Sequence, residues 1–519
     1  MARDTDVSVQ DMGIKEINLT KTVRMDDNGT FYVNPNAHGD FGLSKGDLAY
    51  MISQHRNKLV KKYDDLFDYF RGKHKKILKK PVKDGYNPDN RIIINYPKQI
   101  VTSYVGYFAG VNPSFAVNNK SGLPKADYER YNKELDDFNR NNDINHFFVK
   151  QAKYTDIFGR SLALVYQNEL GLTKLSTLDP RKGFVVYSDD VSEHPVFGVM
   201  YKHIDAAGMI NVDVYGFDVQ YSIGQEFGHV DNGGATATKI NYHAYNVSGN
   251  ADYSLDEMIQ FEQDKIGYGQ LPLIEFTADD ERMSLYEDLL TVFDAIDSAI
   301  SEKKNDVDYF GDAVMFLRNM LVDKETFKNL RDKRMLIGSN NGSGGMNETE
   351  PKAGFLEKPT ADQTQENLIN RLVSAVYDIS GVVNLNDKEF TNAASGQALK
   401  QRLQGMRQNA DTKASMFDKS FRDVYSCLFN GLLMPDAIEN IIIRFKKNEP
   451  IDVLDESSAL VNLSNAVQSG MISQETALGN MTYIEDALDE IEKIKNERKE
   501  QIDTIEDVSV NKPTDNKDK

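Results

Sequence analysis

The sequence has one cysteine and no long apolar run, and each absence excludes a class of protein. A lone thiol, Cys427, cannot form a disulfide within the chain, which fits a reducing compartment. No run approaches the roughly 18 apolar residues of a membrane span, and no apolar signal segment follows Met1. We therefore expect a protein that is made and used in the cytoplasm, or in an assembly built there, with Cys427 as a buried small hydrophobe.

Positive charge is also scarce. The chain carries 80 acidic and 61 basic residues, a net charge of -19, with a pI near 5.0. A protein that coats nucleic acid needs a basic face, so this balance argues against that class without excluding a protein that DNA slides past. The densest basic cluster comprises Arg71, Lys73, Lys75, Lys76, Lys79, Lys80 and Lys83. We interpret it as a solvated helix end, with a phosphate-facing patch as the alternative.

Catalytic motifs are missing as well. No G-x-x-x-x-G-K-[ST] loop, no H-E-x-x-H and no G-x-S-x-G occurs, and the eight histidines are scattered. The acidic pairs Asp189-Asp190 and Asp279-Asp280 fit turns better than cation sites. We expect no enzymatic activity, no catalytic residues, no metal and no cofactor. A hydrolase site assembled from distant residues is the weakest alternative.

A chain of 519 residues is long enough for several domains, and its hydrophobic periodicity changes along its length. Residues 1–45 are polar, and we expect a loosely attached arm. The pattern then predicts helices at 44–78, 98–108 and 128–159, with a short strand at 91–95. Short Val-, Tyr- and Phe-rich runs predict an antiparallel β region with strands at 160–167, 173–178, 184–187, 196–202, 210–215, 219–224 and 239–247.

Two capping boxes mark helix starts in the second half, Ser284 with Glu287 and Thr360 with Gln363. Their helices flank an insertion in which we expect strands at 313–318 and 335–338 and a helix at 324–334, with residues 353–358 closing the unit. After Pro435 we expect a strand at 441–445 and helices at 455–468, 473–479 (N-cap Ser473) and 484–500. The final residues, from about Thr504, are expected to be disordered.

The longest helix is expected over 396–431, after a possible N-cap at Ser395. Apolar residues recur there at alternating three- and four-residue steps, no proline interrupts them, and Gly405 is the weak point. Its apolar face fits either the core of one large domain or contacts with copies of the same helix in a ring. The sequence leaves both possibilities open.

The order of several stretches resembles the portal (head–tail connector) proteins of tailed bacteriophages, of the type found in siphophages of Gram-positive bacteria. The stretches are 95–106, 271–276 followed by 284–298, 379–383 followed by 390–400, and 472–476 followed by 484–486. Each is degenerate alone, and their order over most of the chain makes the resemblance specific.

The resemblance implies an α+β portal fold with an α/β wing, a helical stem, a small α/β clip, a long kinked helix and a helical C-terminal crown. The implied boundaries are 1–45 for an N-terminal arm, 46–283 for the wing, 284–308 for the first stem helix, 309–359 for the clip, 360–383 for the second stem helix, 384–395 for a tunnel loop, 396–434 for the long wing helix, 435–500 for the crown and 501–519 for a disordered tail.

The same resemblance implies a homo-oligomeric ring, usually a 12-mer, at the capsid vertex of the virion, through which double-stranded DNA is packaged and ejected. It also implies the terminase large subunit, the head–tail adaptor, and the major capsid and scaffolding proteins as partners, assembly in the host cytoplasm, and no membrane. The alternative from another class is a self-associating cytoplasmic scaffold protein without a DNA partner.

A uniformly acidic ring cannot centre DNA by repulsion alone, so we expect a few contacts from the implied channel parts. The tunnel-loop candidates are Asp387, Lys388, Glu389, Phe390, Thr391 and Asn392; the stem candidates are Lys303, Lys304 and Arg371; the clip candidates facing motor or adaptor are Lys324, Lys328, Arg331, Lys333 and Arg334. The alternative for each of these lysines and arginines is that its side chain is exposed to solvent and does not contact DNA.

Reversing the charge of Lys388 tests this interpretation. If the lysine contacts DNA in the tunnel loop, Lys388→Glu will reduce the amount of DNA packaged and retained, because a repulsive charge replaces an attractive one. The measurement is nuclease-protected DNA per particle. Unchanged packaging and retention would remove Lys388 from the candidates.

Overall fold

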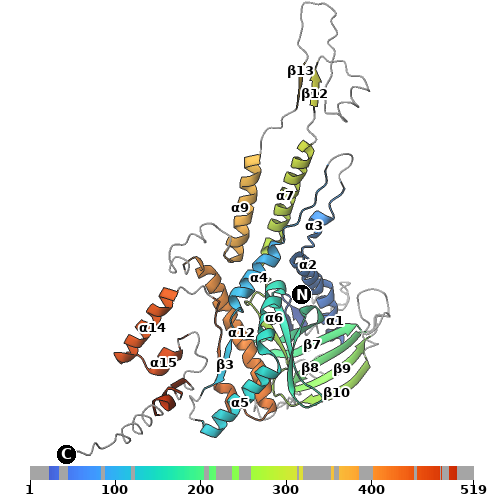
Figure 1. Ribbon diagram of the computed structural model, residues 1–519. Helices are drawn as coiled ribbons and strands as arrows, with labels where there is room; N and C mark the ends of the chain where they lie inside the picture. Colours follow the sequence, from blue (N-terminus) through green and yellow to red (C-terminus); the bar gives the residue numbers. More distant parts are fainter. Residues whose placement is uncertain are drawn as a thin grey trace, which may run out of the picture. The chain divides into compact units, whose positions relative to one another are not determined.

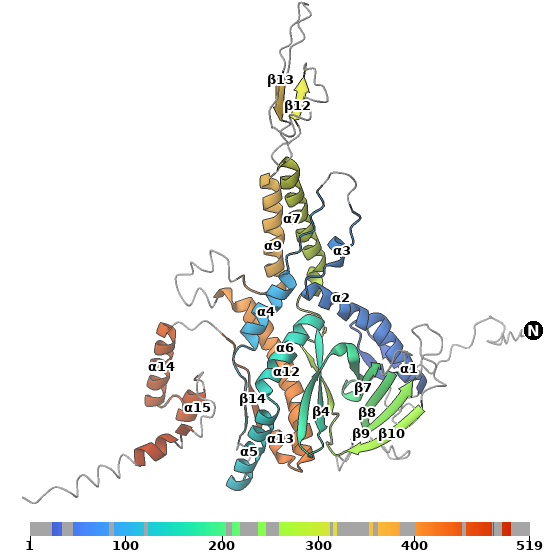
Figure 2. The same cartoon turned by 45° about the vertical axis from the view of Figure 1, so that its right-hand side comes forward.

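The computed structural model describes residues 23–33, 45–82, 88–118, 123–203, 210–217, 237–244, 259–311, 315–318, 352–355, 362–384, 401–448, 453–479, 481, 490–491 and 493–499 (Figures 1 and 2). Helices and strands are mixed along the chain, which confirms the predicted α+β class. The chain divides into two compact units. Unit 1 comprises Met1–Phe67, Gln99–Glu287 and Gly381–Lys519, and unit 2 comprises Asp68–Lys98 and Asp288–Ser380.

The first predicted helix is present but ends earlier than expected. It runs through α1 (Lys45–Gln54), a π-helical stretch (His55–Val60) and α2 (Lys61–Phe70). Gly72 then adopts a φ of 73°, and the amide of Lys73 donates to the carbonyl of Asp68 at 2.7 Å. This is the hydrogen bond that closes a helix C-terminus with a left-handed glycine, so only the short α3 (Lys75–Leu78) follows.

A seven-stranded sheet forms the largest β structure of unit 1, in the order β1-β2-β6-β7-β8-β9-β10. Its central strands are β6 (Gly183–Ser188), β7 (Pro195–His203), β8 (Ile210–Phe217) and β9 (Ala237–Ala244), joined as antiparallel neighbours. They confirm four of the predicted strands. The edge strand β10 (Ile259–Ile266) is absent from the sequence prediction, and the predicted strand at 219–224 lies outside the described residues.

The N-terminal strands of this sheet correct the prediction of a loosely attached arm. β1 (Val23–Met25) and β2 (Phe31–Val33) form a hairpin, and β2 pairs in parallel with β6. Phe31 and Val33 are buried, and the ring of Phe31 lies 4.8 Å from that of Phe184. The arm prediction was wrong for these residues because two three-residue strands are too short to show a periodic pattern.

A second sheet of unit 1 has the order β11-β4-β5, with β4 (Arg160–Gln167), β5 (Thr173–Leu178) and β11 (Leu273–Thr277). The helices α4 (Tyr96–Phe108), α5 (Lys125–Asn141) and α6 (Ile144–Phe158) precede it. The predicted helix over 128–159 is therefore two helices, broken at Asp143, whose φ is 46°. Gly159 ends α6 with a φ of 82°, and a Cβ there would lie 2.0 Å from the carbonyl oxygen of Arg282, so only glycine fits.

The long helix of unit 1 is α12 (Gln404–Gly431), and its apolar face is buried by the chain itself. Met406, Ala410, Phe417, Phe421 and Val424 are all at most 4% exposed. The hypothesis that this face packs against copies of itself in a ring was therefore wrong, and the alternative, a core helix, is correct. A turn at Leu403 precedes α12, two residues before Gly405, the residue predicted to weaken the helix. The predicted N-cap Ser395 lies outside the described residues.

Aromatic rings fill the core around α12. The rings that meet Phe417 and Phe421 come from α4, α6, β11 and the segment after β14 (Ile441–Arg444), namely Phe108, Phe147, Phe148, Phe276 and Phe445. Cys427 is buried too, as predicted, and its thiol faces the carbonyl oxygen of Leu271 at 3.7 Å. Burial of this many aromatic side chains is the main stabilisation of α12.

A fully buried ion pair joins α12 to α6. The Lys413 ammonium lies 2.5 Å from Oδ1 of Asp156 and 3.1 Å from the carbonyl oxygen of Ala152, and both side chains of the pair are 1% exposed. It also lies 4.9 Å from the ring centre of Phe108. Burial lowers the pKa of Lys413 and raises the pKa of Asp156 to about 6, and in each case the partner's charge opposes the shift.

Unit 2 contains α7 (Leu290–Gly311) and α9 (Asp362–Ser380), which match the predicted helices at 284–308 and 360–381, although α7 begins after a 3-10 turn at Glu287–Leu289. Between them in sequence, β12 (Met315–Arg318) and β13 (Lys352–Phe355) form an antiparallel pair. The strand β12 confirms the predicted strand at 313–318, whereas β13 was not predicted as a strand. The predicted helix at 324–334 and strand at 335–338 lie outside the described residues.

The C-terminal elements follow the prediction closely. After α13 (Asp436–Glu439), β14 (Ile441–Arg444) pairs with β3 (Ser114–Val117). The helices α14 (Val453–Gln468) and α15 (Gln474–Gly479) follow, and the hydroxyl of Ser473 accepts the amide of Thr476 at 3.1 Å as the predicted N-cap. In the part of the chain that the structure describes, no helix has the length and apolar character to cross a membrane.

Removing one partner of the buried ion pair tests its contribution to stability. Lys413→Ala leaves the carboxylate of Asp156 buried without its cation, and we expect the free energy of unfolding to fall by about 3–5 kcal/mol. The measurement is urea unfolding followed by circular dichroism. The control is the double variant Lys413→Met with Asp156→Leu, expected near wild type; a loss below about 1 kcal/mol in Lys413→Ala would contradict the argument.

Candidate functional site

The helices α7 and α9 of unit 2 lie side by side (Figures 1 and 2) and form the candidate stem. Lys303 on α7 forms an ion pair with Glu366 on α9, and Nε2 of Gln365 donates to Asp306 at 3.4 Å. Val376 is fully buried, and the rings of Tyr377 and Tyr96 meet edge to face at 6.5 Å. Apolar packing and polar pairs thus hold the two helices together along their length.

The three basic residues predicted to face DNA have different surroundings. Lys303 is three-quarters buried and paired with Glu366, whereas Lys304 pairs with Asp308 on its own helix. Arg371 is exposed and forms no ion pair with any residue that the structure describes. The charges of both lysines are therefore offset locally, and Arg371 is the stem cation best placed to meet an external anion.

The remaining predicted site residues lie outside the described residues. They are the tunnel-loop candidates 387–392 and the clip candidates Lys324, Lys328, Arg331, Lys333 and Arg334. Their roles remain predictions.

An extended segment, residues 90–94, runs along α7 and is bound to it by side chains. The amides of Asn90, Ile92 and Ile94 donate in order to Asn305 Oδ1 at 2.7 Å, Ser301 Oγ at 2.9 Å and Asp297 Oδ1 at 2.9 Å. Two residues of extended chain advance about 6.6 Å and four residues of helix advance about 6 Å, so the two repeats match. The strand predicted at 91–95 was therefore wrong: the segment is extended, but its amides pair with helix side chains.

Asp297 also forms a buried hydrogen bond with His74, which precedes α3. His74 Nδ1 contacts Oδ2 of Asp297, and Nε2 lies 3.3 Å from the carbonyl oxygen of Tyr69; both side chains of the pair are almost completely buried. One turn earlier on α7, Asp294 accepts the hydroxyl of Tyr69 at 2.9 Å. Sequence reasoning missed these contacts, although polar residues at 297, 301 and 305 on an apolar helix are a detectable signal.

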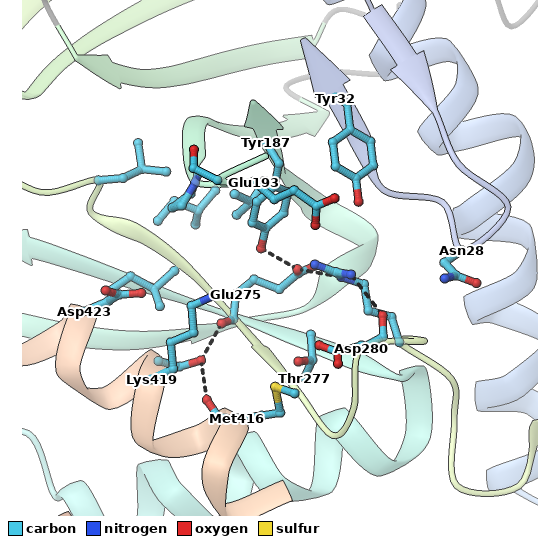
Figure 3. A pocket seen from close by; sticks show the side chains of 18 of the residues that line it. Asn28, Tyr32, Tyr187, Glu193, Glu275, Thr277, Asp280, Met416, Lys419 and Asp423 are labelled. Atoms are coloured by element: carbon cyan, nitrogen blue, oxygen red, sulfur yellow. Dashed lines mark hydrogen bonds and ion pairs between the residues drawn. The ribbon is translucent and has the colours of Figure 1, made fainter. Parts of the chain in front are cut away.

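A cavity of about 450 Å³ lies in unit 1 among β2, β6, β11 and α12 (Figure 3). On its wall, the buried carboxylate of Glu275 accepts hydrogen bonds from Arg160 at 3.1 Å, Arg282 at 3.1 Å and the hydroxyl of Tyr187 at 2.7 Å. Burial opposes ionisation of Glu275, but the two guanidinium groups outweigh it and hold the pKa of this carboxyl below its usual value. The network fixes Arg282, whose φ is 57°.

Further carboxylates line this cavity, so its lining is acidic. They belong to Asp26, Glu193, Asp279, Asp280 and Asp423. The labelled side chains of Glu193 and Asp423 come from different elements in Figure 3. Among the described residues, no three His, Cys, Asp or Glu side chains are placed to hold a metal ion.

Asp423 generates a prediction about pH. Its carboxyl accepts Nε2 of Gln270 at 3.1 Å, and burial, opposed by Lys419, raises its pKa to about 6. Between pH 4 and 6 the folded state therefore binds more protons here than the unfolded state, and stability falls as pH rises. Asp423→Asn keeps an acceptor for Gln270, and we expect it to raise the melting temperature at pH 7 by roughly 1–3 °C but not at pH 4.

The measurement is thermal unfolding of wild type and variant from pH 4 to pH 7. Asp280→Asn is the control, because this exposed carboxylate lines the same cavity. If the melting temperatures of the two variants changed equally with pH, the pH dependence of stability could not be assigned to Asp423.

The sequence is similar to those of known phage proteins over most of its length. The family described as "Phage portal protein, SPP1 Gp6-like" matches residues 51–504, which is more than half of the chain. The portal protein of Bacillus phage SPP1 is 24% identical over 248 residues, which cover 45% of this chain and 45% of that protein. The aligned part therefore spans less than half of this relative.

Proposed function

Since this chain belongs to the SPP1 Gp6-like family of phage portal proteins, we propose that it forms a ring at one capsid vertex through which double-stranded DNA enters and later leaves. A portal protein is an assembly component of the phage capsid. The observation that carries the proposal for this chain is the stalk in unit 2, in which α7 and α9 flank the β12–β13 pair in sequence. That arrangement is what a stem with a small clip requires.

In the proposed ring, α7 and α9 are the stem, and β12 and β13 belong to the clip that docks the terminase large subunit during packaging and the head–tail adaptor afterwards. Residues 384–395 form the tunnel loop, and 435–500 form the crown. Major capsid and scaffolding proteins contact the outside of the ring. DNA passes without being held because α7 carries more acidic than basic residues, which leaves few attractive contacts.

Lateral contacts in this ring involve apolar side chains that unit 2 exposes. Val307 on α7 is 61% exposed, and Leu368 and Ile379 on α9 are 52% and 57% exposed. Leu368 and Ile379 are eleven residues apart, about three helical turns, so they lie on one face of α9. Large exposed apolar side chains aligned on one face support a contact with another subunit, whereas the apolar face of α12 is already covered.

The test is the mass and shape of the purified protein. We expect native mass spectrometry and negative-stain images to show a closed ring of about a dozen subunits with an axial hole wide enough for duplex DNA. A stable single subunit at every concentration and salt tried would contradict the proposal. A dimer or trimer without a hole would favour a scaffold protein.

Introducing charge on the exposed face of α9 tests the lateral contact. We expect Leu368→Asp with Ile379→Asp to shift the protein from rings to smaller species, because two charges would have to be desolvated at the interface. Leu170→Asp in the β4–β5 hairpin is the matched control, since Leu170 is 81% exposed in unit 1. Rings that persist in the double variant would remove this face from the interface.

A further inference from the structure

The densest positive charge of the described chain lies in residues 71–82 of unit 2, here called the basic segment. It carries six lysines and arginines and no acidic residue. Lys75 lies 3.2 Å from Asp68, and Lys76 lies 3.7 Å from Asp294. Lys73, Lys79 and Lys80 form no ion pair with any residue that the structure describes. Three positive charges therefore remain available to an external partner.

This segment is held rigidly on α7. His74 is buried against Asp297, and Ile77 is buried within α3. The guanidinium of Arg91 donates to the carbonyl oxygen of Leu78 at 2.7 Å, which fixes the end of α3. A rigid support reduces the entropy that binding would cost, so the lysines are presented at fixed positions.

Apolar side chains are exposed among these lysines. Leu78 is 45% exposed and Val82 is 75% exposed. Phosphate groups gain nothing from such side chains, because DNA contacts of this kind rest on charge and hydrogen bonds. Unpaired lysines beside exposed aliphatic groups fit a protein partner that offers both negative charge and apolar contact.

An acidic strip lies on another face of α7. Ala295 and Glu302 are exposed, and their spacing of seven residues places them in one row along the helix; Asp288 is exposed in the preceding turn. Asp306 continues the row but is half-buried and accepts the side-chain amide of Gln365 on α9. Within the basic segment, His74 contacts Asp297, which lies on a different side of α7 from the acidic strip. The helices α3 and α9 lie on opposite sides of α7 in both views (Figures 1 and 2). Segment and strip therefore face different directions in one subunit.

We propose that the basic segment of one subunit binds the acidic strip of α7, namely Asp288 and Glu302, in the next copy of this chain. Two different faces of opposite charge are what a head-to-tail contact requires, and such contacts close into rings. The small Ala295 in the middle of the strip leaves space for Leu78 or Val82. The proposal rests on the proposed ring and names the surfaces that orient neighbouring subunits.

The experiment reverses each surface separately and then together. The first variant is Lys73→Glu, Lys79→Glu and Lys80→Glu, the second is Asp288→Lys with Glu302→Lys, and the third combines all five changes. Sedimentation velocity at several salt concentrations measures ring formation. We expect each separate reversal to weaken assembly roughly tenfold or more at low salt, with the difference shrinking at high salt. The combined variant should recover most of the loss.

The control reverses three exposed basic residues of α5, Lys125, Arg130 and Lys133, which changes the net charge by the same amount as the first variant. Circular dichroism and thermal unfolding of all variants separate lost assembly from lost folding. A first variant that unfolds is replaced by Lys73→Gln, Lys79→Gln and Lys80→Gln, which removes the charge without reversing it.

Each outcome decides the proposal. Rings that form with unchanged salt dependence in both separate reversals overturn the proposed contact and leave the proposed function intact. Unchanged rings with weaker binding of a linear DNA duplex identify the basic segment as a phosphate contact and also overturn it. A wild-type chain that forms no ring overturns both proposals.

Discussion

An extended backbone that runs along a helix has no neighbouring strand to accept its N–H groups, so the helix must supply the acceptors. In unit 2 this requirement is met by Asp297, Ser301 and Asn305, which bind the amides of residues 90–94. Because the three acceptors occupy one row of α7, they fix how the helix is rotated about its axis. That rotation decides which side of α7 packs on α9 and which side carries the acidic strip.

Unit 1 depends on a different constraint, the burial of charge beside aromatic rings. Lys413 places an ammonium group in the core, where Asp156 and the carbonyl of Ala152 are its polar partners. A buried pair of this kind adds little stability compared with apolar residues, and we infer that its role is to favour one position of α12 against α6. The aromatic rings around Phe417 and Phe421 supply the apolar burial, and the ion pair specifies the register of the helix.

The sequence predicted the helices and strands better than it predicted which segments they contact. The capping box at Ser284 located the start of the α7 region, and the amide of Ser284 does face Glu287 at 3.3 Å. The apolar repeat of α12 identified a buried face, but periodicity does not tell whether the same chain or another copy covers it. Residues 90–94 have the composition of a strand, and only the polar row on a distant helix reveals where their amides pair. All three candidate stem cations were named from the sequence, but the pairing of Lys303 with Glu366 joins residues 63 positions apart on two different helices and could not be predicted.

The strand pairings of unit 1 have a consequence for biosynthesis. β2 pairs with β6 more than 150 residues later, and β3 pairs with β14, which begins at Ile441. A nascent chain must therefore keep both early strands unpaired until their partners leave the ribosome, and the pairing of β3 waits for most of the polypeptide. A product of interrupted translation that stops before Ile441 lacks the partner of β3, so its sheet is incomplete.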